Sequence, residues 1–183
     1  YTSFQNIREK NFLITKNLVY FSFFQITLMI ASFLLLIFAF VFSDFSLLAV
    51  YQNSHTEKPI FYKIAGVWGN HEGSLLLWVN IMVIFSFLFF LFNNKYNKSF
   101  SLYTLLVQNI LILGFLIFLV SNSNPFFKIL PIPLEGLGLN PILQDPSLAI
   151  HPPLLYLGFV GSSIYFSAAT AAILSNSDGK KFA

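Results

Sequence analysis

The stretch WGNHEGSLLLWVNIMVIFSFLFFLF, from Trp68 to Phe92, predicts how this chain folds. After the adjacent His71 and Glu72, it continues as an uncharged and mostly apolar run. At about 20 residues, the run is long enough to cross the hydrocarbon of a bilayer as a helix. Ionisable groups so close to a membrane span are rare unless they have a role. The stretch therefore predicts a transmembrane helix with two polar groups of interest at its start.

The composition of the whole chain also indicates a membrane protein. Of its 183 residues, 56% are hydrophobic and only 9% are charged, whereas a soluble domain carries about 25% charged residues. The sequence contains no cysteine, which excludes a disulfide, a thiolate metal site or a cysteine nucleophile within it. The formal net charge is only +3 and the basic residues flank apolar runs, so no nucleic-acid-binding surface is predicted.

Four long uncharged intervals predict four transmembrane helices, and hence an all-α polytopic integral membrane protein. The predicted spans cover about residues 18–42, 73–92, 101–121 and 152–174. We expect a polar N-terminal segment (1–17), a single transmembrane domain (18–175) and a basic C-terminal tail (176–183). The fourth span is rich in glycine, serine and alanine, which let helices approach closely in lipid, so we expect it to pack inside a bundle. Its neighbours there could belong to this chain or to another.

The placement of lysine and arginine predicts the orientation in the membrane. Most of the ten basic residues fall before the first span, between the second and third spans, or after the fourth, and Lys58, Lys63 and Lys128 are the exceptions. Both termini are therefore expected on the matrix or cytoplasmic side. The two long loops, Ser43–His71 and Asn122–His151, are then on the outer side, in the intermembrane space or periplasm.

The second outer loop is both long and apolar. It holds most of the eight prolines of the chain together with apolar residues such as Phe126, Phe127 and Leu130. A disordered linker would be polar, and long ordered loops are commonly functional. We expect two ordered outer loops, with the second packed at the membrane surface. The alternative is a plain hydrophobic connector among the lipid headgroups.

Helix capping explains the polar groups at the start of the second span. Asn70 is placed to cap the helix with its side-chain oxygen. Glu72 then faces the positive end of the helix dipole, which stabilises the carboxylate by about 0.3–1 kcal/mol. His71 and Glu72 do not form the zinc-protease motif H-E-x-x-H, because Leu75 stands where the second histidine is required. The local prediction for both residues is a structural role.

His151 is a better candidate for a metal or haem ligand. It precedes Pro152 and Pro153, which we expect to open the fourth helix, and a residue before proline favours extended backbone. The positive end of the helix dipole would disfavour an imidazolium there, and neutral imidazole is the form that binds metal or haem iron. The alternative is a histidine that caps its own helix or binds a loop carbonyl. His55, in the polar stretch QNSHTEK, is interpreted as a solvated loop histidine.

Other patterns are less informative. Trp68 and Trp78 could stack on a flat ligand, although an interfacial anchor explains Trp68 equally well. The sequence contains no P-loop, dinucleotide-binding glycine motif or serine nucleophile elbow. A transporter would need a polar path, and the predicted spans contain no ionisable relay. Their larger polar side chains are Gln25, Asn80, Gln108 and Asn109.

The segment WGNHEGSLLLW, Trp68–Trp78, resembles the WGxHEGSxLLW segment of the CcmF/NrfE family of cytochrome c maturation haem lyase subunits. The segments SNSNPF, GLGLNPILQDP and HPPLLYLGFVG resemble further parts of that family, in the same order and at suitable separations. The resemblance covers about residues 41–172. It implies a polytopic membrane protein that attaches haem vinyl groups to the cysteines of a C-x-x-C-H motif in apocytochrome c.

The resemblance also implies a cofactor, partners and site residues. The cofactor is haem, and the partners are a CcmE-type haem chaperone, a CcmH-type thiol protein, apocytochrome c and membrane lipid. In the family, haem contacts a tryptophan-rich WWD loop between two outer-loop histidines. His151 matches the first of these histidines, so the resemblance favours His151 as an axial haem ligand. Trp68, His71 and Glu72 are then expected to shape the outer platform beside that haem.

Several features of the family do not occur in this sequence. They are the WWD motif, the second flanking histidine, the histidines of the family's own b-type haem, and a further span before residues 18–42. We therefore expect the N-terminal part of a split family member that is not catalytic alone, with another chain carrying the WWD motif. Split forms occur in mitochondria, so we expect the mitochondrial inner membrane, or otherwise a bacterial inner membrane. The alternative function is a family-derived structural subunit of a respiratory membrane complex.

Overall fold

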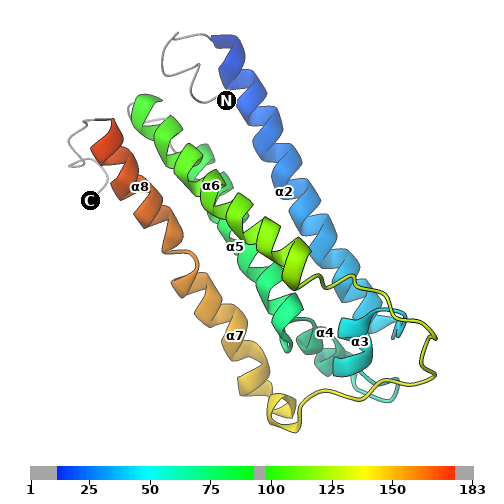
Figure 1. Cartoon of the computed structure of the whole chain (residues 1–183). Helices are drawn as coiled ribbons and strands as arrows, with labels where there is room; N and C mark the ends of the chain where they lie inside the picture. The colour runs from blue at the N-terminus through cyan, green and yellow to red at the C-terminus, as the bar shows by residue number, and fades with distance from the viewer. Residues whose placement is uncertain (1–11, 93–97, 176–183) are drawn as a thin grey trace.

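The computed structural model describes residues 12–92 and 98–175, and this part of the chain is helical with ordered connecting loops (Figure 1). The predicted C-terminal tail (176–183) and most of the predicted N-terminal segment (1–17) lie outside the described residues. The helical elements are α2 (Phe12–Val41), α3 (Leu48–Asn53), α4 (Ile60–Trp68), α5 (His71–Phe92), α6 (Lys98–Asn122), the 3-10 helix η2 (Pro141–Gln144), α7 (Pro146–Phe159) and α8 (Ser163–Leu174). The prediction of an all-α polytopic membrane protein is confirmed.

Four helical stretches are long and apolar enough to cross a membrane, as predicted. They are Val19–Val41, His71–Phe92, Ser99–Asn122 and Pro146–Leu174. The fourth stretch comprises α7 and α8, which are separated by a break at residues 160–162. The start of α2 and the end of α8 lie at one end of the bundle, and α3, α4 and the long loops lie at the other (Figure 1). We refer to the end with α3 and α4 as the loop end.

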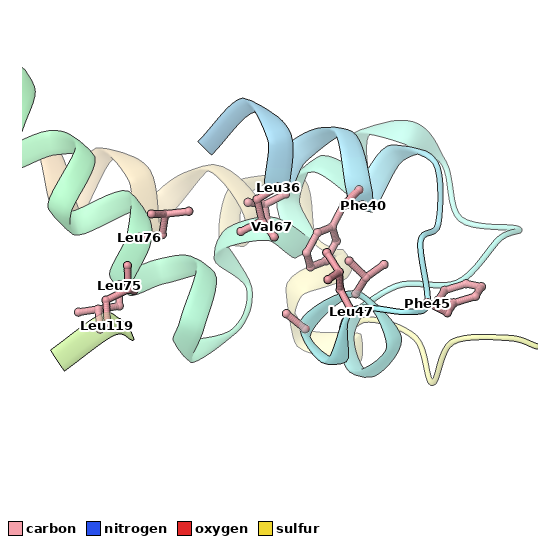
Figure 2. Close-up of a cluster of buried hydrophobic side chains, with 11 residues drawn as sticks. Leu36, Phe40, Phe45, Leu47, Val67, Leu75, Leu76 and Leu119 are labelled. Atoms are coloured by element: carbon pink, nitrogen blue, oxygen red, sulfur yellow. The ribbon is translucent and has the colours of Figure 1, made fainter. Parts of the chain in front are cut away.

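The helices pack around apolar clusters that differ between the two ends of the bundle. At the loop end, Leu36 and Phe40 of α2 belong to one cluster with Val67 of α4 (Figure 2). Further into the bundle, α5 and α6 share a second cluster that includes Met82 and Ile112. Both Phe40 and Val67 are completely buried. The short helix α4 is therefore part of the core and carries Trp68 at a fixed place.

Three of the larger polar side chains of the spans make hydrogen bonds across helices, and the fourth, Asn80, donates to Leu76 within α5. Gln25 of α2 donates a hydrogen bond to Asn109 of α6 (3.1 Å). Gln108 of α6 is completely buried; it donates to Ser163 (2.9 Å) and accepts from Ser167 (2.7 Å), both on α8. Interhelical hydrogen bonds in lipid contribute about 0.6 kcal/mol on average and up to about 2 kcal/mol. These groups hold the bundle together rather than forming a polar path.

The fourth span packs against the other helices through the small residues of α8, but it lies at the edge of the bundle and not inside it as predicted (Figure 1). α8 lies against α6, with Ser167, Ala168 and Ala171 buried. At the break before α8, a Cβ on Gly161 would lie 2.6 Å from the ring of Phe85 on α5 and 2.3 Å from the carbonyl oxygen of Leu157. Only glycine allows this approach. For this packed face of α8, the neighbouring helices are within the chain itself.

The two long loops, predicted to lie on the outer side, are ordered and run alongside each other, which confirms that they are ordered. The backbone N–H of Leu48 donates to Phe127 (2.9 Å), and that of Ile129 donates to Ser46 (2.9 Å). Sequence analysis did not predict that the first loop folds into α3 and α4. Leu134 of the second loop is 99% exposed. Packing of this loop at the membrane surface remains a prediction.

Glu135 joins the second outer loop to the first. Its carboxylate accepts hydrogen bonds from the hydroxyl and the backbone N–H of Thr56, the latter at 3.0 Å, and from the backbone N–H of Gly136 at 2.9 Å. The Thr56 hydroxyl and the Gly136 N–H are the main reasons that the pKa of Glu135 is lowered to about 2, and His55, 3.9 Å away, adds to the effect. Glu135 is thus held in the ionised form.

The substitution Glu135→Gln tests this contact between the loops. The folded-state pKa lies below the ordinary value of 4.5, so the ionised carboxylate stabilises the fold above pH 4.5 and loses that effect as pH falls towards about 2. We expect the variant to unfold at a lower temperature than the parent at pH 7, with the difference shrinking between pH 4.5 and about 2. Thermal unfolding in detergent measures it. Glu57→Gln is the control, and an unchanged difference across this range would contradict the assignment.

Candidate functional site

Asn70 fixes the turn between α4 and α5. Its side-chain oxygen accepts a hydrogen bond from the backbone N–H of Gly73 (2.7 Å), which confirms the predicted N-cap. Its amide donates to the carbonyl oxygens of Gly66 (2.8 Å) and Val67 (3.2 Å) at the end of α4. The end of one helix and the start of the next are therefore bound to a single side chain.

Gly73 makes this turn unusually tight. A Cβ on Gly73 would lie 1.6 Å from the carbonyl oxygen of Val67, so no other residue fits without moving α4. The hydroxyl of Ser74 donates to the carbonyl oxygen of Trp68 (2.6 Å) across the same turn. The residues that open α5 thereby hold the last residue of α4 in place.

His71 and Glu72 lie in the first turn of α5, as predicted. The imidazole Nε2 of His71 and the hydroxyl of Ser123 are hydrogen-bonded at 2.9 Å, which links the start of α5 to the residue after α6. Ser123 is buried, whereas His71 is exposed. Glu72 is half-buried, and its carboxylate has no hydrogen-bond or ion-pair partner within residues 12–92 and 98–175. Ser123 gave no signal in the sequence that would identify it as the partner of His71.

The prediction that Pro152 and Pro153 open the fourth helix is wrong. The helix α7 begins at Pro146, and the side chain of Asp145 accepts hydrogen bonds from the backbone N–H groups of Ser147 (2.8 Å) and Leu148 (3.3 Å). The two prolines are therefore inside the helix. His151 has helical backbone in the second turn, and the argument that the helix dipole keeps it neutral no longer applies. An acidic N-cap followed by proline is itself a helix-start signal.

The interior prolines leave two carbonyl groups of α7 without helical donors. In an α-helix each carbonyl accepts from the N–H four residues later, and proline has no N–H. The carbonyls of Leu148 and Ala149 lose their donors in this way. The indole N–H of Trp68 donates to the carbonyl oxygen of Ala149 at 2.8 Å.

Two further contacts hold α7 against α5. The hydroxyl of Tyr156 donates to the hydroxyl of Ser74 (3.5 Å). The ring of Trp78 packs edge-on against that of Tyr156, with ring centroids 5.5 Å apart. It also packs against the ring of Phe159, with ring centroids 6.0 Å apart. Both tryptophans of WGNHEGSLLLW thus contact α7. These contacts explain Trp68 and Trp78 without a flat ligand.

His151 lies on the outward face of α7. Its side chain is exposed, and it has no hydrogen-bond or ion-pair partner among the described residues. Leu148, Leu154 and Leu155, one turn before and one turn after it, are 43%, 62% and 48% exposed. The imidazole therefore lies among exposed leucines, with the exposed Ser147 one turn before it as a second polar group. No group of three or more His, Cys, Asp or Glu side chains within the described ranges could hold a metal ion.

The substitution Gly73→Ala tests the tight turn that positions Trp68 and His71. The added methyl group must displace the end of α4, so we expect a loss of more than about 2 kcal/mol in the free energy of unfolding. Gly114→Ala is the matched control, because a Cβ there meets no atom within 4 Å; it should be neutral or slightly stabilising. Unfolding in detergent measures both. Equal effects of the two substitutions would contradict this description of the turn.

Comparison with known proteins gives the relationship of the chain. Residues 68–182 match the model of the family described as cytochrome C assembly protein. The chain is 52% identical over 144 residues to the cytochrome c-type biogenesis protein CycK of Bradyrhizobium diazoefficiens. The aligned region covers 79% of this chain and 22% of that protein. It is 46% identical over 145 residues to the cytochrome c-type biogenesis protein CcmF of Escherichia coli, again covering 79% of this chain and 22% of the relative.

A solved structure has the same fold. The chain superimposes on the cytochrome c haem lyase CcmF with a TM-score of 0.79 and 24% identity, over 96% of this chain and 27% of that one. The chain thus spans about a quarter or less of the length of the proteins it matches. The family match covers more than half of the chain and includes both WGNHEGSLLLW and His151. This chain belongs to the cytochrome c assembly protein family, among the relatives named CcmF, CycK and NrfE.

Proposed function

We propose that this chain is a membrane subunit of a cytochrome c haem lyase, which helps to position haem for thioether attachment to apocytochrome c. His151 provides one axial ligand of the haem iron. Trp68, His71 and Glu72 form the outer platform that carries α7 beside the haem. The chain is not catalytic alone. The WWD loop and the remaining histidines come from polypeptide that corresponds to the rest of the relatives' length.

The exposed and unpaired imidazole of His151 on a mostly apolar helix face carries this proposal. An exposed imidazole that no other side chain binds is available as a ligand. No described residue is its partner, and neutral imidazole is a preferred ligand of haem iron. The apolar side chains around it suit the macrocycle of haem. The residues present therefore fit haem on one side of the iron.

The described residues supply only part of a haem site. They offer His151 for one side of the iron, and we propose that the second axial ligand comes from the polypeptide that corresponds to the rest of the relatives' length. When bound, haem supplies the vinyl groups that receive the cysteine thiols of apocytochrome c. The chain itself orients the macrocycle through His151 and the platform. A CcmE-type chaperone that delivers haem and a CcmH-type thiol protein that handles apocytochrome c complete the proposed system.

The length of the fourth span supports a location of His151 at the outer membrane surface. Pro146–Leu174 contains 29 residues, which in a helix extend for about 40 Å. The hydrocarbon core is only about 30 Å thick, so the stretch is longer than the core, and we place the excess at the start of α7. We place both termini on the cytoplasmic or matrix side of a bacterial or mitochondrial inner membrane. Lipid headgroups then surround the exposed apolar side chains of the second outer loop.

Replacement of His151 by alanine tests the ligand assignment. In the complex assembled with its partner polypeptides, we expect loss of the histidine signature in the haem absorption spectrum. Haem attachment to apocytochrome c should fall by roughly tenfold or more, as for the loss of a group that governs metal affinity. His55→Ala is the control. His71→Ala should remove the hydrogen bond to Ser123 but keep the axial signature.

Three results would count against this function. Unchanged haem content and attachment in the His151→Ala complex would contradict the ligand assignment. Loss of the axial signature in the His71→Ala complex, with assembly intact, would show that the roles of the two histidines are exchanged. Stoichiometric co-purification with respiratory subunits, and with no haem-handling partner, would instead support the structural subunit of a respiratory complex.

A further inference from the structure

We infer that Trp68 is a positioning residue whose indole N–H takes the place of the backbone N–H that Pro153 lacks. This hydrogen bond holds the helical conformation of α7 that displays His151. The part of the inference that concerns His151 rests on the proposed function. The part that concerns Trp68 and Pro153 is independent of it.

The need for a donor at this position follows from burial. The carbonyl oxygen of Ala149 would accept from the N–H of residue 153, which is proline. Ala149 is only 1% exposed, so water has almost no access to it. A buried carbonyl without a donor is costly, and interior prolines persist in membrane helices where neighbouring groups satisfy the freed backbone. The indole N–H of Trp68, 2.8 Å from this oxygen, is such a group.

The indole binds one of the two freed carbonyls and not the other. Pro152 frees the carbonyl of Leu148, a residue that is 43% exposed. Pro153 frees the carbonyl of Ala149, and this is the one that Trp68 contacts. The two prolines are adjacent and chemically identical. They therefore form a matched pair in which only Pro153 should be coupled to Trp68.

Trp68 is well fixed for this role. Its own carbonyl oxygen accepts from Ser74 (2.6 Å), and the tight turn at Gly73 sets the relation of α4 to α5. The hydroxyl of Ser74 also accepts from Tyr156 of α7. Two connected hydrogen bonds therefore join the α4–α5 turn to α7, one on each side of His151. A change at Ala149 reaches His151 within the same helical turn.

A double-mutant cycle tests the coupling. Trp68→Phe removes the N–H and keeps an aromatic ring, and we expect it to lower the unfolding midpoint of the full chain in detergent by about 2–4 °C. Pro153→Ala restores a backbone donor to Ala149, so in that background Trp68→Phe should cost less than half as much. In the Pro152→Ala background, Trp68→Phe should lower the unfolding midpoint as much as it does in the parent chain. If Trp68→Phe alone does not fold, recovery by Pro153→Ala but not by Pro152→Ala is the same test.

A spectroscopic measurement tests the link to His151. In the assembled complex, Trp68→Phe should shift the haem absorption band without abolishing it, and Pro153→Ala should reverse the shift. The coupling would be overturned if Trp68→Phe lowered the unfolding midpoint equally in the parent, Pro153→Ala and Pro152→Ala backgrounds. Equal rescue by Pro153→Ala and Pro152→Ala would also overturn it. Rescue of stability without any effect on the haem band would overturn the positioning role. Failure of the His151→Ala test alone would overturn the proposed function and leave the unfolding cycle valid.

Discussion

The hydrogen bond from Trp68 to the carbonyl oxygen of Ala149 joins two parts of the molecule that the chain separates widely. On one side is the α4–α5 unit, which the core cluster around Phe40 and Val67 anchors to α2. On the other is α7, whose interior prolines remove backbone donors, one of them at the buried Ala149. The bond supplies a donor to a buried carbonyl group of α7 that would otherwise lack one. It also helps to fix where α7 lies. Together with the contacts of Tyr156 and Trp78, it places α7, and His151 with it, against the α4–α5 unit.

The tight turn at Asn70 and Gly73 gives this bond its direction. Because a Cβ on Gly73 would overlap the carbonyl oxygen of Val67, α4 and α5 have little freedom relative to each other. The turn carries Trp68 towards α7 and His71 towards the end of α6. A rigid platform with an exposed imidazole beside it can orient a large flat ligand without surrounding it. This arrangement suits a chain that provides only part of a site.

Much of this architecture could be predicted from the sequence, because it depends on local composition. The four spans follow from uncharged runs of sufficient length, and the cap at Asn70 follows from a polar residue before such a run. The helices α3 and α4 were missed because they are short and tertiary contacts hold them within a loop. The start of α7 was placed at Pro152 because proline suits a first turn. Asp145 and Pro146 give the same signal earlier, and the donor from Trp68 that replaces the N–H missing at Pro153 is a tertiary contact.

The state of the Trp68 indole proton tests the account most directly. The chain has two tryptophans, so ¹⁵N-indole labelling in detergent gives two resonances, and a Trp78→Phe variant assigns them. The account predicts that the Trp68 indole proton exchanges slowly with solvent. It also predicts that the resonance shifts in the Pro153→Ala variant and much less in the Pro152→Ala variant. An indole proton that exchanges as fast as that of a free indole, and responds to neither substitution, would contradict it.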